Sequence, residues 1–170
     1  MRNGNASRSA RASQVYEELE NIGKQRYLVD TSSLIYMIEN GIKFKGDLYA
    51  PRQMIDEMQT HAARGKILKA AADAVKLAPC APVKEHMEIK ADVILAYEAA
   101  CSEKKRTRDP ISQPDINFAV EALKQAMHGR ALKVLSEDQH IYRTLEHLLK
   151  TEKYRGFDDL IKVVSLSRLA

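Results

Sequence analysis

The chain of 170 residues has few cysteines, no tryptophan and no long apolar run. Its two cysteines, Cys80 and Cys101, lack the C-x-x-C spacing of zinc and redox motifs, so the sequence indicates neither a disulfide framework nor a cysteine zinc site. No apolar run approaches the roughly 18 residues that cross a membrane. These absences fit a reducing compartment, and we expect a cytoplasmic protein without membrane partners.

Aromatic residues and net charge are also modest. With three phenylalanines and no tryptophan, the chain offers few platforms on which nucleic-acid bases can stack. The formal net charge of +4 permits nucleic-acid binding without arguing for it. Residues 1–13 hold no acidic residue and lack the apolar core of a secretory signal, so we expect a flexible basic arm. Residues 14–170 are enough for one domain with its own core.

The stretch 27–38 organises the rest of the sequence. A short apolar run ends at Asp30, and small hydroxyl residues and a second apolar run follow. This pattern predicts a buried strand that passes directly into a helix over 32–40. In open α/β sheets ligands bind at the carboxyl ends of the strands, which makes Asp30 a candidate for chemistry.

Strands and helices alternate along the remainder of the chain. Further strands are predicted at 48–50, 131–136 and 161–166. Helices are predicted at 13–24, from 51 onward, at 62–77, 84–105 and 114–127, and from 138 to 150. We therefore expect an α/β domain with parallel strands.

The helix that begins at Pro51 carries a second candidate carboxylate. Helical spacing predicts that Glu57 shares the apolar face of Met54 and Met58, while Asp56 falls among polar residues. A carboxylate on a buried face is costly unless it is paired or bound to a cation. Glu57 is therefore a candidate ligand.

Two later aspartates stand in similar places. Asp115 lies in the first turn of the helix at 114–127 on the side of Phe118 and Ala119, although first turns also favour aspartate through the helix dipole. Asp138 follows the strand at 131–136 and repeats the pattern around Asp30: a strand, a small hydroxyl residue (Ser136), an aspartate and a helix. Both are candidates for the same edge of the sheet.

Four inward carboxylates repel one another in a low dielectric unless divalent cations lie between them. Ligand sets made only of oxygen favour Mg²⁺ or Mn²⁺. Such ions activate a water and stabilise the leaving oxygen of a phosphodiester. The pattern therefore favours metal-dependent hydrolysis of a phosphodiester bond.

In their order and local setting these segments resemble the PIN-domain nucleases. The resemblance covers about 27–149 and rests on four motifs: Val-Asp-Thr-Ser-Ser at 29–33, Leu-Tyr-Ala-Pro with Ile-Asp-Glu-Met at 48–58, Ser-Gln-Pro-Asp at 112–115 and Val-Leu-Ser-Glu-Asp at 134–138. It implies a three-layer α/β/α sandwich with a central, mostly parallel sheet and a metal site at its carboxyl edge. The segment 60–111 is longer than in compact toxin-like members, and we expect a helical insertion there, as an arm for oligomers or for gripping RNA.

The resemblance also assigns roles to individual residues. It implies that one or two Mg²⁺ or Mn²⁺ ions are held by four catalytic carboxylates, namely Asp30, Glu57, Asp115 and Asp138. It implies that nearby hydroxyl groups orient these carboxylates or a water, namely those of Thr31 or Ser32, and of Ser136. Asn117 stands where some members carry a further acid, and Glu137 is an alternative to Asp138 as a ligand, so the number of ions stays open.

The implied substrate is RNA (tRNA, rRNA or mRNA), cut to leave 5′-phosphate and 3′-hydroxyl ends. Basic residues near the predicted site are candidates for phosphate contacts. They are Arg52, Arg64, Lys66, Lys69 and, in the loop at 104–108, Lys104, Lys105, Arg106 and Arg108. The loop also fits a solvated helix end, because cations suit helix C-termini; both interpretations stay open.

The predicted function is a divalent-metal-dependent endoribonuclease in RNA processing or toxin-type RNA cleavage. The alternative is a catalytically silent PIN-like module that binds RNA or a protein, although four retained acids argue against it. A toxin would have an inhibitory antitoxin as its partner, and a homo-oligomer also fits. A phosphotransferase of the haloacid-dehalogenase type is disfavoured because Ser32 stands where it needs a second aspartate. The five histidines form no H-x-x-x-H pair, and we expect ordinary surface or half-buried positions for them.

Overall fold

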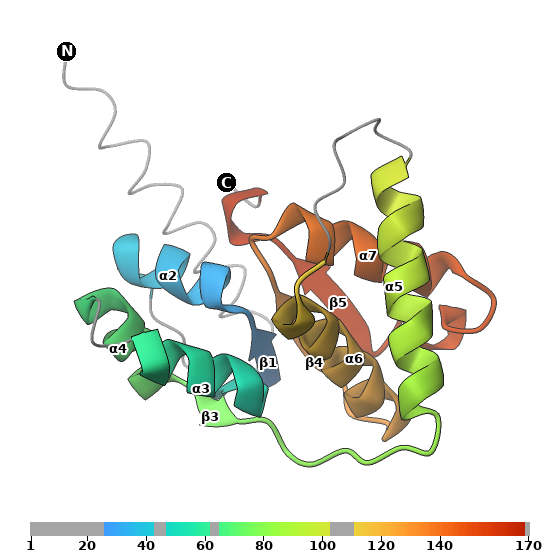
Figure 1. Ribbon diagram of the computed structural model, residues 1–170, viewed down its shortest axis with the longest axis horizontal. Coiled ribbons are helices and arrows are strands. Elements are labelled where there is room, and N and C mark those ends of the chain that lie inside the picture. The colour runs from blue at the N-terminus through green and yellow to red at the C-terminus, as the bar shows by residue number, and fades with distance from the viewer. Residues whose placement is uncertain (1–25, 43–46, 62–64, 103–110, 169–170) are drawn as a thin grey trace.

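The computed structural model describes residues 26–42, 47–61, 65–102 and 111–168 (Figure 1). The predicted arm at 1–13, the predicted helix at 13–24 and the basic loop at 104–108 lie outside these residues. The described segments form a sheet of five parallel strands in the order β3-β2-β1-β4-β5. The strands are β1 (Arg26–Val29), β2 (Asp47–Ala50), β3 (Lys76–Leu77), β4 (Leu132–Leu135) and β5 (Ile161–Val164).

Helices cover both faces of this sheet, so the α/β three-layer architecture expected from the sequence is confirmed. Among the described residues the α-helices are α2 (Thr31–Glu39), α3 (Arg52–His61), α4 (Lys66–Ala74), α5 (His86–Ser102), α6 (Gln113–Met127) and α7 (Gln139–Lys150). Figure 1 shows α2, α3 and α4 grouped around β1 and β3, and α5, α6 and α7 grouped around β4 and β5. No helix in the described part of the chain has the length and apolar character needed to cross a lipid bilayer.

The central strand β1 is buried on both of its faces. Tyr27, Leu28 and Val29 are each at most 3% exposed, as expected for a parallel strand covered by helices on both sides. β1 pairs with β2 along one edge and with β4 along the other, where Val29 is the partner of Leu135. This register places the residues that follow the two strands, Asp30 and Ser136, beside each other.

The chain reverses its direction across the sheet between β1 and β4. From β1 it moves outward to β2 and β3, and then it crosses back to β4 and β5 on the other side. In open parallel sheets such a switch point leaves a crevice at the carboxyl ends of the strands, where ligands bind. The fold therefore singles out the carboxyl edge of β1 and β4.

The predicted strands at 27–29, 48–50, 131–136 and 161–166 correspond to β1, β2, β4 and β5. β3 was missed, because residues 62–77 were expected to form one helix. α4 ends at Ala74, and the extended backbone of Val75 leads into β3. Alanine-rich sequence favours a helix, whereas an edge strand of two residues is specified by its pairing with β2, which local propensity does not contain.

The predicted insertion at 60–111 is built into the domain. It supplies the edge strand β3 and the helix α5, which packs against α6 and α7. One apolar stripe of α5 is buried, namely Ile89, Val93, Ala96, Tyr97 and Ala100. On the outer side of α5, Lys153 joins the carboxylates of Glu88 and Asp92 at 2.5 and 2.6 Å.

We expect Phe118→Ala to lower the free energy of unfolding by about 3–5 kcal/mol, because the fully buried ring leaves a cavity beneath α6. Leu95→Ala is the matched control, since that side chain is 62% exposed and its loss should change stability by no more than about 0.5 kcal/mol. Urea unfolding followed by circular dichroism measures both. Equal losses for the two variants would contradict the core described here.

Candidate active site

Asp30 is a buried carboxylate at the junction of β1 and α2. It is 2% exposed and caps the first turn of α2, where its Oδ1 accepts the backbone N–H of Ser33 at 2.7 Å. The Ser32 hydroxyl donates to the same oxygen at 2.9 Å, and the Ser136 hydroxyl donates to Oδ2. Both oxygens of the carboxylate are thus fixed by donors from β1–α2 and from the end of β4.

Burial raises the pKa of the Asp30 carboxyl above its usual range. The hydrogen bonds from Ser136, from the Ser33 backbone and from Ser32 act in the opposite direction but do not cancel the effect of burial. An ionised Asp30 is therefore stabilised less by its surroundings than by water, and a nearby cation would favour it.

Ser136 connects Asp30 with Asp138. Besides donating to Asp30, its Oγ accepts the backbone N–H of Asp138 at 3.2 Å. Asp138 is the N-cap of α7 and accepts the backbone N–H of His140 at 2.7 Å, while about a third of its side chain stays exposed. The two strand–helix junctions predicted from the sequence are therefore joined through one serine.

Asp115 approaches this pair from α6. Its Oδ2 accepts the hydroxyl hydrogen of Ser112, the N-cap of α6, at 2.6 Å. Burial raises the pKa of the Asp115 carboxyl, and the negative charge of Asp138 raises it further, against the hydrogen bond from Ser112 and the charge of His140. The structure thus brings Asp30, Asp115 and Asp138, three of the four predicted acids, to one edge. We call this group the carboxylate edge.

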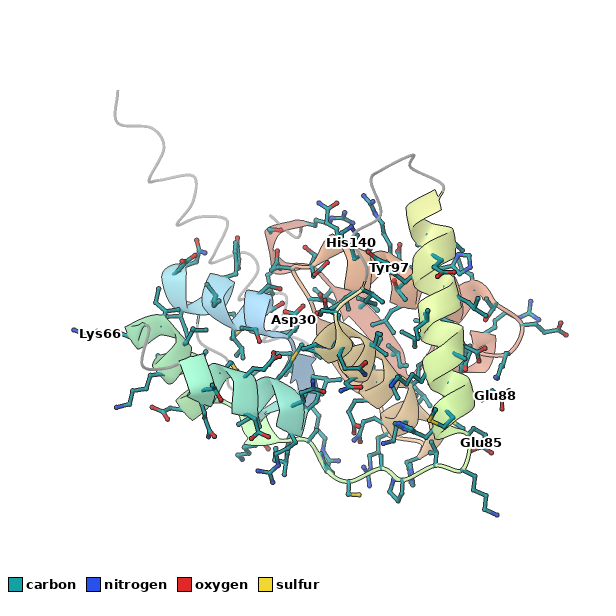
Figure 2. All side chains as sticks on the ribbon, viewed as in Figure 1. Asp30, Lys66, Glu85, Glu88, Tyr97 and His140 are labelled. Atoms are coloured by element: carbon teal, nitrogen blue, oxygen red, sulfur yellow. The ribbon has the colours of Figure 1, made fainter. Side chains whose placement is uncertain are left out.

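His140 stands next to the carboxylate edge and was not singled out by the sequence. Its Nδ1 lies 3.7 Å from Oδ1 of Asp138, and its ring meets the buried Tyr97 ring of α5 edge to face at a centroid distance of 5.6 Å. Figure 2 shows Tyr97 and His140 adjacent to each other at the start of α7. In the sequence His140 belongs to no H-x-x-x-H pair, and its place two residues after Asp138 is the signal that could have identified it.

A second unpredicted contact joins α3 to α6. The Asn117 side-chain amide donates to the side-chain oxygen of Gln53. Asn117, noted as a position where a further acid would stand, is thus engaged by the first turn of α3, close in sequence to Asp115. The contact holds the start of α3 against the start of α6.

The prediction that Glu57 faces the apolar side of its helix is wrong. Glu57 is exposed, whereas Met54, Ile55 and Met58 are buried. The buried face of α3 includes Ile55, so it is centred on the side of the helix away from Glu57. The predicted apolar face was therefore rotated about the helix axis relative to the observed one. Glu57 lies one turn beyond Gln53 on α3.

Glu137, considered from the sequence as an alternative metal ligand to Asp138, binds backbone groups of the C-terminal turn. Its Oε1 accepts the backbone N–H groups of Leu166 and Ser167, at 2.5 and 3.2 Å, at the turn η3 (Leu166–Arg168). The Glu137 carboxylate is thus engaged by the residues that follow β5. Asp138 is therefore the better candidate ligand of the two.

The other predicted positions are distributed around the fold. Of the hydroxyl residues, Ser32 and Ser136 contact Asp30, and Thr31 is the half-buried first residue of α2. Arg52 is exposed at the start of α3, immediately beyond the carboxyl end of β2. Lys66 lies at the outer end of α4, far from Asp30 (Figure 2). Lys69 is exposed on α4, and Arg64, Lys104, Lys105, Arg106 and Arg108 lie outside the described residues.

The donors at the carboxylate edge are oxygens, which suit Mg²⁺ or Mn²⁺. Their electrostatics also fit a cation, because burial raises the pKa values of Asp30 and Asp115, and the charge of Asp138 raises that of Asp115 further. Across the described segments, no three acidic, histidine or cysteine side chains form a ready group for a metal ion. The charges of Asp115 and Asp138 act directly on each other, and Ser136 links Asp30 to the backbone of Asp138.

We expect Asp30→Asn to stabilise the metal-free protein at neutral pH. Because the folded-state pKa of Asp30 is raised, the protonated form contributes stability that is present below the unfolded-state pKa and lost as pH rises through the folded-state pKa. In EDTA at pH 7.5 the variant should melt a few degrees above wild type, since about 1 kcal/mol corresponds to roughly 3 °C. The difference should shrink as the pH approaches about 4.

Thermal melts across this pH range measure the effect, with the exposed Asp56→Asn as the control that should show no such trend. A variant that melts below wild type at every pH would contradict the assignment of a destabilising buried charge to Asp30.

No family model matches the chain, and comparisons with curated proteins and with solved structures give no match. The resemblance of the four acidic segments to the PIN-domain nucleases therefore stays a prediction from the sequence.

Proposed function

We propose that the protein is a divalent-metal-dependent endoribonuclease that works at the carboxyl edge between β1 and β4. The observation that carries this proposal is the buried carboxylate of Asp30, which Ser136 joins to Asp138 at a topological switch point. The resemblance of the four acidic segments to PIN-domain nucleases supports the reaction class and RNA as the substrate.

In this proposal Asp30, Asp115 and Asp138 hold the ion or ions. A bound Mg²⁺ or Mn²⁺ would activate a water and neutralise the charge that develops on the leaving 3′ oxygen. Ser136 and Ser32 hold the Asp30 carboxylate in one orientation, so that the ligand is fixed before the ion arrives. The repulsion between Asp115 and Asp138 would be relieved by the cation, which makes metal binding favourable at this edge.

A second candidate is a catalytically silent module of the same fold that binds RNA or a protein. Two observations favour it: the described residues contain no ready three-ligand group, and Glu57 is exposed on α3. The buried Asp30 carboxyl argues against it, because a module without an ion gains nothing from burying a group whose ionised form is destabilised by burial.

We expect the wild type to cleave a pool of labelled tRNA and single-stranded RNA with Mg²⁺ or Mn²⁺ and not with EDTA. Asp30→Asn and Asp138→Asn should each lower the rate by about 10²–10³-fold, the usual cost of losing one group that stabilises charge in the transition state. Asp56→Asn, an exposed carboxylate outside the carboxylate edge, should cleave like wild type. No metal-dependent cleavage, with RNA bound equally by wild type and Asp30→Asn, would instead support the silent module.

Glu57 and Asp56 form a matched pair for testing the fourth predicted ligand, because both are exposed neighbours on α3. We expect both Glu57→Gln and Asp56→Asn to leave Mn²⁺ binding unchanged, because both side chains are exposed on α3 and the ion is proposed to lie on Asp30, Asp115 and Asp138. An affinity about tenfold weaker for Glu57→Gln alone would contradict this expectation. Isothermal titration with Mn²⁺ measures both. If the two variants bind Mn²⁺ alike, Glu57 is a surface residue and the ion is held by the carboxylate edge alone.

A further inference from the structure

The turn after β5 is hydrogen-bonded to Glu137, the residue that precedes Asp138 of the carboxylate edge. Glu137 stands between Ser136 and Asp138, and its carboxylate accepts the backbone N–H groups of Leu166 and Ser167. The neighbouring Ser165 hydroxyl donates to the second oxygen of Glu137 at 3.4 Å. We call these contacts the Glu137 latch; they hold the turn η3 at the edge of the sheet where β4 meets α7.

The latch places Arg168 beside the first turn of α7. The Arg168 guanidinium lies over the ring of Tyr142, with its carbon 4.8 Å from the ring centroid. Tyr142 is one helical turn beyond Asp138, whose carbonyl oxygen accepts the Tyr142 N–H at 3.0 Å. Figure 1 shows the C-terminal turn beside the start of α7. The positive charge of Arg168 is thereby held about one helical turn from Asp138, a member of the carboxylate edge.

The chemistry of this pair suits a phosphate. Arg168 is exposed, and although its guanidinium also contacts the Tyr142 hydroxyl, the planar group has five N–H donors, more than this contact uses, for a planar or tetrahedral oxyanion. Glu146 also acts on the Tyr142 hydroxyl, with a charge opposite to that of Arg168, so the pair is not purely basic. The carboxylate edge itself repels a polyanion, and an adjacent cation offsets this repulsion.

We infer that Arg168, stacked on Tyr142 and held by the Glu137 latch, binds a backbone phosphate of single-stranded RNA next to the bond cleaved at the carboxylate edge. This inference rests on the proposed function, because it takes RNA as the substrate. It makes Glu137 a positioning residue, which acts through the turn that carries Arg168.

The test is RNA binding in EDTA, where no cleavage occurs, measured by fluorescence anisotropy with a labelled 12-nucleotide single strand. We expect Arg168→Gln to weaken binding about fivefold and to make the slope of log K against log salt shallower by about 0.7, the value for one lost phosphate contact on a single strand. Arg155→Gln is the control, because Arg155 is an exposed arginine beyond the far end of α7. It should match wild type.

Variants of the partners separate the stack and the latch from a simple charge effect. Tyr142→Leu and Glu137→Gln should each weaken binding in the same direction as Arg168→Gln. Thermal melts verify that each variant is folded. Equal affinity and equal salt slope for Arg168→Gln and Arg155→Gln would overturn the inference, as would a wild type that binds no RNA.

Cleavage in Mg²⁺ distinguishes this inference from the proposed function. With an active wild type, Arg168→Gln should raise KM and leave kcat nearly unchanged. If the protein cleaves RNA and Arg168→Gln behaves like Arg155→Gln, the inference fails and the nuclease stands. If nothing is cleaved but binding still depends on Arg168, the nuclease fails and the phosphate contact stands.

Discussion

The burial of one carboxyl group between two strands is the constraint on which the rest of the molecule depends. Asp30 leaves β1 at the point where β1 pairs with β4, so its carboxylate is surrounded by the core. Such a group is tolerated only when its oxygens are hydrogen-bonded, and here the donors come from the first turn of α2 and from Ser136. The register of Val29 against Leu135 is therefore both a packing feature and the source of the site.

The N-termini of the helices around this edge supply a positive electrostatic potential that partly offsets the negative charges of the carboxylates. α2, α6 and α7 all begin near it, and their N-caps are Asp30, Ser112 and Asp138. The positive ends of helix dipoles stabilise carboxylates by a few tenths to about 1 kcal/mol each, mainly within the first turn. This field is too weak to remove the repulsion between Asp115 and Asp138 or the cost of burying Asp30, and the remaining deficit is what a divalent cation would offset.

The sequence predicts those parts of the fold that depend on local pattern. Continuous apolar runs identified β1 and β4, and the aspartates that follow them could be placed at one edge because parallel strands share their carboxyl end. Asp115 could be added from helical spacing. β3 and the exposure of Glu57 could not be predicted, since an edge pairing and the inclusion of Ile55 in a buried face depend on tertiary contacts. The role of Glu137 was likewise hidden, because its partners are backbone groups 29 and 30 residues away.

The central claim is that the carboxylate edge binds a divalent cation. The most direct measurement is an anomalous difference map from a crystal of the wild type soaked in Mn²⁺. The account predicts a peak at about 2.1 Å from oxygens of Asp30 and Asp138, absent in Asp30→Asn. A map of a well-soaked crystal with no peak at this edge, or with peaks only at other surface carboxylates, would contradict it.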